Sequence, residues 1–194
     1  MRRLAHGRRH DLLLGPAQSY PTRLQVLLNE RYWGQSIVMV NAGQAGERAT
    51  EGVGRLPGVL SQQAPEVLLL LDGANDLNSL RWRGGASWVA IALEELVVEA
   101  RRRNIQVFLT TLPPWRNGGP KQLDASLVPP LNDQIRRIAT DRGAVLVDLA
   151  AAFEGGMDRL IGADGLHPTE AGYQRMAEAF FQVIVQTLEL PSGR

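Results

Sequence analysis

The residues best suited to chemistry lie in one short stretch near the C-terminus, Asp164-Gly165-Leu166-His167-Pro168. The carboxylate of Asp164 can accept a hydrogen bond from one ring nitrogen of His167. The other nitrogen is then free to take a proton from a hydroxyl nucleophile. Proline at the first helical position favours a helix start, so we expect Pro168 to begin the last helix and His167 to lie on the preceding loop. A helix cap beside a packed histidine has the same spacing, so this stretch alone assigns no function.

The composition is that of an ordinary globular protein and removes several kinds of chemistry. The 194 residues are 44% hydrophobic and 21% charged, and the formal net charge of +1 gives no argument for a nucleic-acid partner. The absence of cysteine excludes a disulfide, a thiol nucleophile and a thiolate metal site. No apolar run approaches the roughly 18 residues that suggest a membrane span. We expect one domain over residues 1–194 and a cytoplasmic location, or export if the true N-terminus is missing.

Apolar runs that predict strands alternate with helical patterns along the chain. Strands are expected at 37–40, 67–71, 105–111 and 144–148. Helices are expected at 19–31 with Ser19 as N-cap, up to 63 with breaks at glycines and Pro57, at 128–142 and at 169–188. A further helix is expected at 88–103, with Trp88, Ile91, Ala92, Leu96 and Val97 inward. Residues 1–18 fit no element, and 112–123 is expected to be a long loop. The alternation predicts an α/β protein, a three-layer α/β/α sandwich around a parallel sheet.

Four polar or glycine positions should converge at one edge of that sheet. Gly46 and Asn75 each follow a predicted strand, and Asp164 and His167 lie beyond the fourth. Ligands bind at the carboxyl ends of parallel strands. A glycine lets a backbone N–H approach a ligand closely, and an asparagine offers N–H donors to a developing oxyanion. Together with an oriented histidine base, these groups would support acyl transfer by a hydroxyl nucleophile.

Three segments, in this order, resemble the conserved blocks of the SGNH/GDSL hydrolases, a family of esterases and lipases. The segment from Asn41 to Glu47, Asn-Ala-Gly-Gln-Ala-Gly-Glu, resembles the second block, with Gly46 as the oxyanion-hole glycine. Gly73-Ala74-Asn75-Asp76-Leu77 resembles the third block, with Asn75 as the oxyanion asparagine. Asp164-Gly165-Leu166-His167-Pro168 resembles the fifth, which carries the catalytic Asp and His. Ser19-Tyr20-Pro21 also resembles the segment after the first block, so the likeness covers about residues 19–190 and implies a flavodoxin-like fold.

The sequence departs from this family at the nucleophile. The first block should read Gly-Asp-Ser-Leu after an apolar strand, but no serine precedes Ser19. The nearest remnant is His10-Asp11-Leu12-Leu13, in which Leu12 takes the place of the serine. Three interpretations stay open. Residues 1–18 are a misread or truncated start, the chain is an inactive domain that binds acyl or acetyl groups, or Ser19 replaces the nucleophile.

The resemblance implies a serine-type hydrolase of a carboxylic ester or thioester, related to lipases, esterases and lysophospholipases. Its partner would be a small-molecule acyl ester, and its chemistry needs no metal and no organic cofactor. Asp72 and Asp76 could suggest a metal site, but we expect Asp76 to cap or brace its turn. Trp82, Trp88 and Trp115 lie near predicted loops, where we expect core or cap packing rather than an acyl pocket.

Overall fold

The structure, a computed structural model, describes residues 2–6, 18–78, 85–117, 121 and 123–189. The described part contains one parallel sheet with the strand order β2-β1-β3-β4-β5. The strands are β1 (Arg2–His6), β2 (Ile37–Asn41), β3 (Val67–Leu70), β4 (Gln106–Thr110) and β5 (Val145–Val147). The helices are α1 (Tyr20–Arg31), α2 (Ala49–Gln63), α3 (Ala74–Leu77), α4 (Gly85–Arg102), the 3-10 helix η2 (Ala125–Leu127), α5 (Val128–Arg142), α6 (Leu149–Ala152), α7 (Met157–Leu160) and α8 (Glu170–Leu188).

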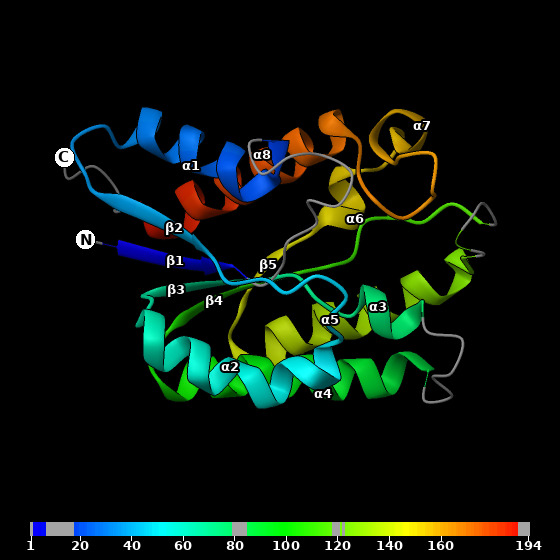
Figure 1. The fold of residues 1–194 in the computed structure, drawn as a ribbon, viewed down its shortest axis with the longest axis horizontal. Helices are drawn as coiled ribbons and strands as arrows, with labels where there is room; N and C mark the ends of the chain where they lie inside the picture. The colour runs from blue at the N-terminus through cyan, green and yellow to red at the C-terminus, as the bar shows by residue number, and fades with distance from the viewer. Residues whose placement is uncertain (1, 7–17, 79–84, 118–120, 122, 190–194) are drawn as a thin grey trace.

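The elements form the three layers that the sequence predicts. In Figure 1, α1 and α8 cover one face of the sheet, and α2, α4 and α5 cover the other. All four residues of β3 are buried, as expected for a strand covered on both faces. The predicted helix at 128–142 coincides with α5, where Pro129 lies in the first turn and Gly143 adopts the left-handed conformation at the C-terminus.

The start of the chain contradicts the expectation that residues 1–18 fit no element. Arg2–His6 forms β1 in the interior of the sheet, where it pairs with β2 on one side and β3 on the other. Two parallel neighbours supply backbone hydrogen bonds whatever the side chains are, so this pairing overrides the poor strand propensity of the segment. The strand at 37–40 is observed as β2, but it lies at the sheet edge and is only partly buried.

Two helices differ from their predicted form. The second helix is not broken at Pro57, because α2 continues through it and packs on α4. In α4 Ala92, Leu96 and Val97 are buried as expected, but the inward positions expected for Trp88 and Ile91 are wrong, since these two residues are 56% and 48% exposed. The buried stripe of α4 consists of Val89, Ala90, Ala92, Leu93, Leu96, Val97 and Ala100.

The C-terminal helix begins later than its proline suggests. Thr169 is the N-cap of α8, and its hydroxyl accepts a hydrogen bond from the backbone N–H of Gly172 at 3.1 Å. Pro168 therefore precedes the helix and forms an isolated bridge with Ile161. The segment between β5 and His167, expected to be a loop, contains the short helices α6 and α7. Among the described helices, none is both long and apolar enough to cross a membrane.

Candidate active site

The loop before α8 joins Asp164 and His167 directly. Oδ2 of Asp164 lies 2.5 Å from Nδ1 of His167, and both side chains are largely buried. Oδ1 of Asp164 accepts the backbone N–H groups of His167 at 2.9 Å and Leu166 at 3.0 Å. When Nδ1 donates to the carboxylate, the neutral ring has its lone pair on Nε2. The arrangement fixes the ring orientation and leaves a basic nitrogen for proton transfer.

These hydrogen bonds keep Asp164 ionised. Burial alone raises the pKa of Asp164. Hydrogen bonds from the His167 ring and from the backbone N–H groups of His167 and Leu166 outweigh that effect and hold the pKa below its ordinary value of 3.8. The carboxylate is therefore charged at neutral pH and can stabilise a positive charge that develops on the imidazole.

The lowered pKa of Asp164 predicts a pH-dependent contribution to stability. The contribution is fully present above the ordinary pKa of 3.8 and is lost as pH falls through the folded-state value. Asp164→Asn should therefore lower the free energy of unfolding near neutral pH, and the deficit should shrink as pH falls below 3.8 and through the lower folded-state pKa. Urea unfolding at several pH values measures this, with Asp141→Asn as an exposed control. A deficit that does not change with pH would contradict the assignment.

The turn after β3 places Asn75 beside the turn that contains Gly46. Gly73 has a left-handed backbone with φ +98°, and α3 begins at the next residue. The side-chain amide of Asn75 donates to the backbone carbonyl of Glu47 at 2.8 Å. Glu47 follows Gly46, whose own φ is +79°. The two predicted oxyanion groups are thus linked through a single residue, and the Asn75 amide has a second N–H to offer.

An ion pair that sequence reasoning missed anchors this turn. The carboxylate of Glu47 is only 4% exposed and receives Nε and Nη2 of Arg55 at 2.5 Å each. Nη1 of Arg55 also donates to the carbonyl of Ala42 at 3.0 Å. A guanidinium that holds a carboxylate through two bonds is a rigid contact. Arg55 on α2 therefore fixes both ends of the turn that contains Gly46.

Asp72 and Asp76 are engaged by the backbone. Asp76 is fully buried and accepts the backbone N–H of Ala49 at 2.8 Å and the hydroxyl of Thr50 at 3.3 Å. It therefore braces the start of α2, whereas the sequence predicts a cap or brace of its own turn. Asp72 accepts the N–H of Gly73 at 2.6 Å. Within the described residues, no group of three His, Cys, Asp or Glu side chains is arranged to hold a metal ion.

A small cavity brings the His167 loop and the turn after β3 together. Its volume is about 30 Å³, which by size admits a water molecule or a very small group. It is lined by Leu71, Asp72, Ala74, Leu112, Pro113, Trp115, Leu166, His167, Pro168, Tyr173 and Met176. Trp115 is buried and lines this cavity with His167. Trp88 is exposed, although the sequence predicts core or cap packing for it, and Trp82 lies outside the described residues. Ala74, the neighbour of Asn75, shares this cavity with His167.

The nucleophile candidates differ in their placement. Leu12 lies outside the described residues. Ser19 occupies the N-cap position of α1, but its side chain makes no capping bond and lies 3.1 Å from the hydroxyl of Thr22. Ser19 is only 6% exposed. The geometry thus favours a structural role for Ser19 at the start of α1.

Comparison with known proteins places this arrangement in a family. The model of the GDSL-like Lipase/Acylhydrolase family matches residues 4–175. Esterase TesA of Pseudomonas aeruginosa is 28% identical over 167 residues, which are 85% of this chain and 77% of that protein. A multidomain esterase of Ruminococcus flavefaciens is 27% identical over 137 residues, 69% of this chain but only 17% of that protein.

The fold agrees with that match. The crystal structure of a lipase/acylhydrolase from Enterococcus faecalis superimposes with a TM-score of 0.80 at 21% identity, and all of both chains is covered. Its low sequence identity makes this a likeness of fold. The family model, in contrast, extends from β1 into α8 and includes every block described above. The chain therefore belongs to the GDSL-like lipase/acylhydrolase family, the SGNH hydrolases.

Proposed function

We propose that this chain carries the active site of a serine-type hydrolase of carboxylic esters or thioesters, in which His167 is the general base. The observation that carries the proposal is the hydrogen bond from Nδ1 of His167 to Asp164, next to the turn that holds Asn75. Family membership supports an esterase or acylhydrolase activity, and the relatives with the names esterase and TesA support the same class.

Each group has a role in the proposed reaction. A serine oxygen attacks the acyl carbonyl while its proton moves to Nε2 of His167, and Asp164 stabilises the imidazolium. The backbone N–H of Gly46 and the second amide N–H of Asn75 donate to the oxyanion. The imidazolium then protonates the leaving alcohol or thiol. Water then attacks the acyl-enzyme and gives its proton to Nε2 of His167, which in turn protonates the departing serine oxygen.

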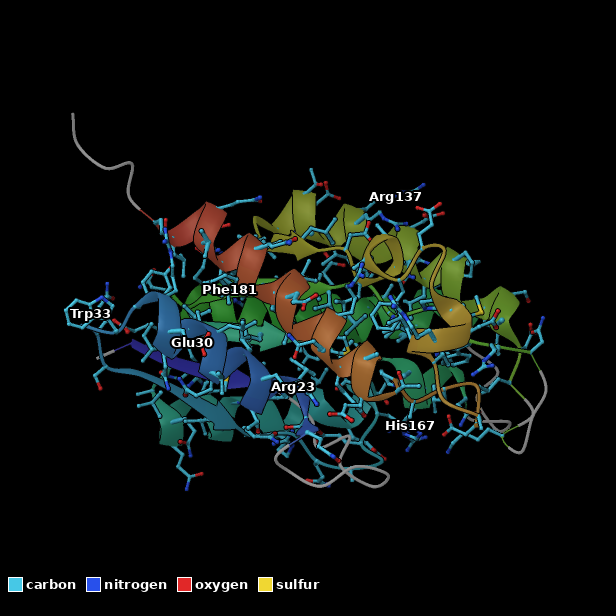
Figure 2. All side chains as sticks on the ribbon, turned by 90° about the horizontal axis from the view of Figure 1, so that it is seen from above. Arg23, Glu30, Trp33, Arg137, His167 and Phe181 are labelled. Atoms are coloured by element: carbon cyan, nitrogen blue, oxygen red, sulfur yellow. The ribbon has the colours of Figure 1, made fainter. Side chains whose placement is uncertain are left out.

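The contact between the starts of α1 and α8 supports a nucleophile that lies before α1 in the sequence and reacts beside His167. Arg23 in the first turn of α1 donates to Glu170 at 2.8 Å and to Gln174 at 3.0 Å, which belong to the first turns of α8. Figure 2 shows Arg23 and His167 toward the same end of this helix pair and Trp33 toward the other. The start of α1 therefore lies on the side of the molecule where His167 lies.

A second candidate function is an inactive SGNH-like domain that binds acyl or acetylated ligands. The absence of any serine among residues 1–18 favours it. A variant that carries a serine after β1 distinguishes the two functions. Ester hydrolysis that depends on His167 would support the hydrolase, and ligand binding without hydrolysis would support the binding domain.

The unaltered chain is expected to show no ester hydrolysis above background and no labelling by a fluorophosphonate probe. The reason is that the chain has no serine at the end of its first strand, and Ser19 is nearly buried. Hydrolysis of a short-chain aryl ester and mass spectrometry of probe-treated protein measure the two quantities. Robust turnover with the probe attached to Ser19 would contradict the prediction and assign the nucleophile to Ser19.

A further inference from the structure

Arg116, in the irregular segment after β4, contacts the backbone of the loop that carries Asp164 and His167. Its Nη2 donates to the carbonyl of Ile161 and, at 2.6 Å, to that of Gly162. Its backbone N–H donates to the carbonyl of Gly165 at 2.9 Å. One residue from a distant part of the chain thus contacts this loop at three backbone positions.

The same loop is closed by its own hydrogen bonds. The N–H of Gly162 donates to the carbonyl of His167 at 2.7 Å, and the N–H of Gly165 donates to the carbonyl of Gly162 at 3.0 Å. Gly162 therefore links the contact with Arg116 to the backbone of His167. A shift of Gly162 would be transmitted directly to His167 and to the turn that holds Asp164.

Close packing at Gly165 shows how tightly the two segments meet. Gly165 has φ +79°, and a Cβ at this position would lie 2.9 Å from the carbonyl oxygen of Arg116. A side chain at Gly165 would thus be strained in its backbone and would also push the two segments apart. The glycine allows the backbone of Arg116 to lie directly against the loop.

The carbonyl contacts, rather than an ion pair, hold the guanidinium of Arg116. The nearest carboxylate is that of Asp158, which is 4.0 Å away on a fully exposed side chain, and such surface pairs contribute little. Nε of Arg116 is buried without a hydrogen-bond partner, which is an unfavourable environment for an N–H group. The guanidinium leaves Nε without a hydrogen bond in the same conformation that lets Nη2 donate to two carbonyls of the loop.

We propose that Arg116 is a positioning residue that holds the loop so that the carboxylate of Asp164 stays directed at Nδ1 of His167. The inference rests on the catalytic roles proposed above for those two residues. Arginine suits the task because its guanidinium is planar and permanently charged, and the two N–H groups of Nη2 can reach two carbonyl oxygens at once. Lysine keeps the charge but offers a single flexible ammonium group.

The test follows the Asp164–His167 contact itself and needs no esterase activity. In Arg116→Ala and Arg116→Lys, the pKa of Asp164, followed by carbonyl-carbon NMR, should rise toward its ordinary value, more in the alanine variant. The Nδ1 proton signal of His167 should broaden by exchange in both. Arg103→Ala is the matched control, because Arg103 bonds Glu99 and Ser61 far from the loop and should leave both signals unchanged.

Two outcomes would overturn the inference. One is an Asp164 titration in folded Arg116→Ala that matches the unaltered chain. The other is a shift in Arg116→Ala with none in Arg116→Lys, which would assign the effect to charge alone. If the alanine variant does not fold, the lysine variant decides, and an unshifted Asp164 in it overturns the inference. Since both readouts exist without turnover, failure of the esterase proposal would be seen separately.

Discussion

The triple variant Arg8→Asp, Arg9→Ser and His10→Leu is expected to hydrolyse short-chain aryl esters at least about a thousandfold faster than the unaltered chain. β1 ends at His6, and Gly7 follows it directly. The substitutions create Gly-Asp-Ser-Leu in the place that the family's first block has relative to its strand. A serine there would join the proposed base His167 and the proposed oxyanion donors, and such groups act as a unit.

A second variant, with the same four-residue block three positions later, tests whether the position of the serine relative to β1 matters. His10→Gly with Leu12→Ser also gives Gly-Asp-Ser-Leu, now over residues 10–13. We expect the block that follows β1 directly to be the active one. Initial rates with an aryl ester and labelling by a fluorophosphonate measure both variants.

A hydroxyl-free control separates the chemistry from a change in folding. Arg8→Asp, Arg9→Ala and His10→Leu differs from the active design by one oxygen and should remain inactive. If both serine variants fold, bind an acyl ligand and fail to hydrolyse it, the inactive binding domain becomes the better assignment. If only the Leu12→Ser variant is active, the nucleophile belongs where the sequence remnant suggests.

Much of the fold can be predicted because local patterns determine it. The run at 67–71 is apolar at every position, so it reads as a strand covered on both faces, and β3 is one. The contact between Asp164 and His167 can be predicted for the same reason, since the two residues are only three positions apart on one loop. The catalytic roles of these residues remain predictions.

Other features depend on partners that the local sequence does not contain. β1 is a strand because β2 and β3 pair with it on both sides, although its own residues are poor strand formers. The phase of α4 is set by packing on α2 and α5, which leaves Trp88 and Ile91 exposed. Continuation of α2 through Pro57 has the same origin, because tertiary packing offsets the lost backbone hydrogen bond.

The residues that support the site were the hardest to predict. Glu47 lies at the end of a motif, but nothing in that motif indicates that its carbonyl orients Asn75 or that Arg55 binds its carboxylate. Arg116 is 45 residues away in sequence from Ile161, whose carbonyl it contacts. Contacts of this kind follow from the arrangement of the loops around the sheet, so no spacing rule along the chain reveals them.

In the serine-bearing variant, His167→Ala is expected to reduce kcat by about ten-thousandfold or more, and Asn75→Ala by about a hundredfold. In the proposed mechanism His167 removes the serine proton and protonates the leaving group, so its loss would disable the nucleophile in both half-reactions. Asn75 supplies one of several donors to the oxyanion, so the others retain part of the stabilisation. Initial-rate kinetics over a range of ester concentrations give kcat and KM for each variant.

The relative sizes of these two losses test the geometry. The amide of Asn75 also bonds Glu47, so Asn75→Ala loosens the turn at Gly46 as well, and thermal unfolding of each variant separates that effect from the loss of the donor. Asn29→Ala, which removes an exposed amide on α1, should leave kcat unchanged. If His167→Ala cost no more than Asn75→Ala, another group would be acting as the base. The bond between Asp164 and Nδ1 of His167 would then serve only to stabilise the loop before α8.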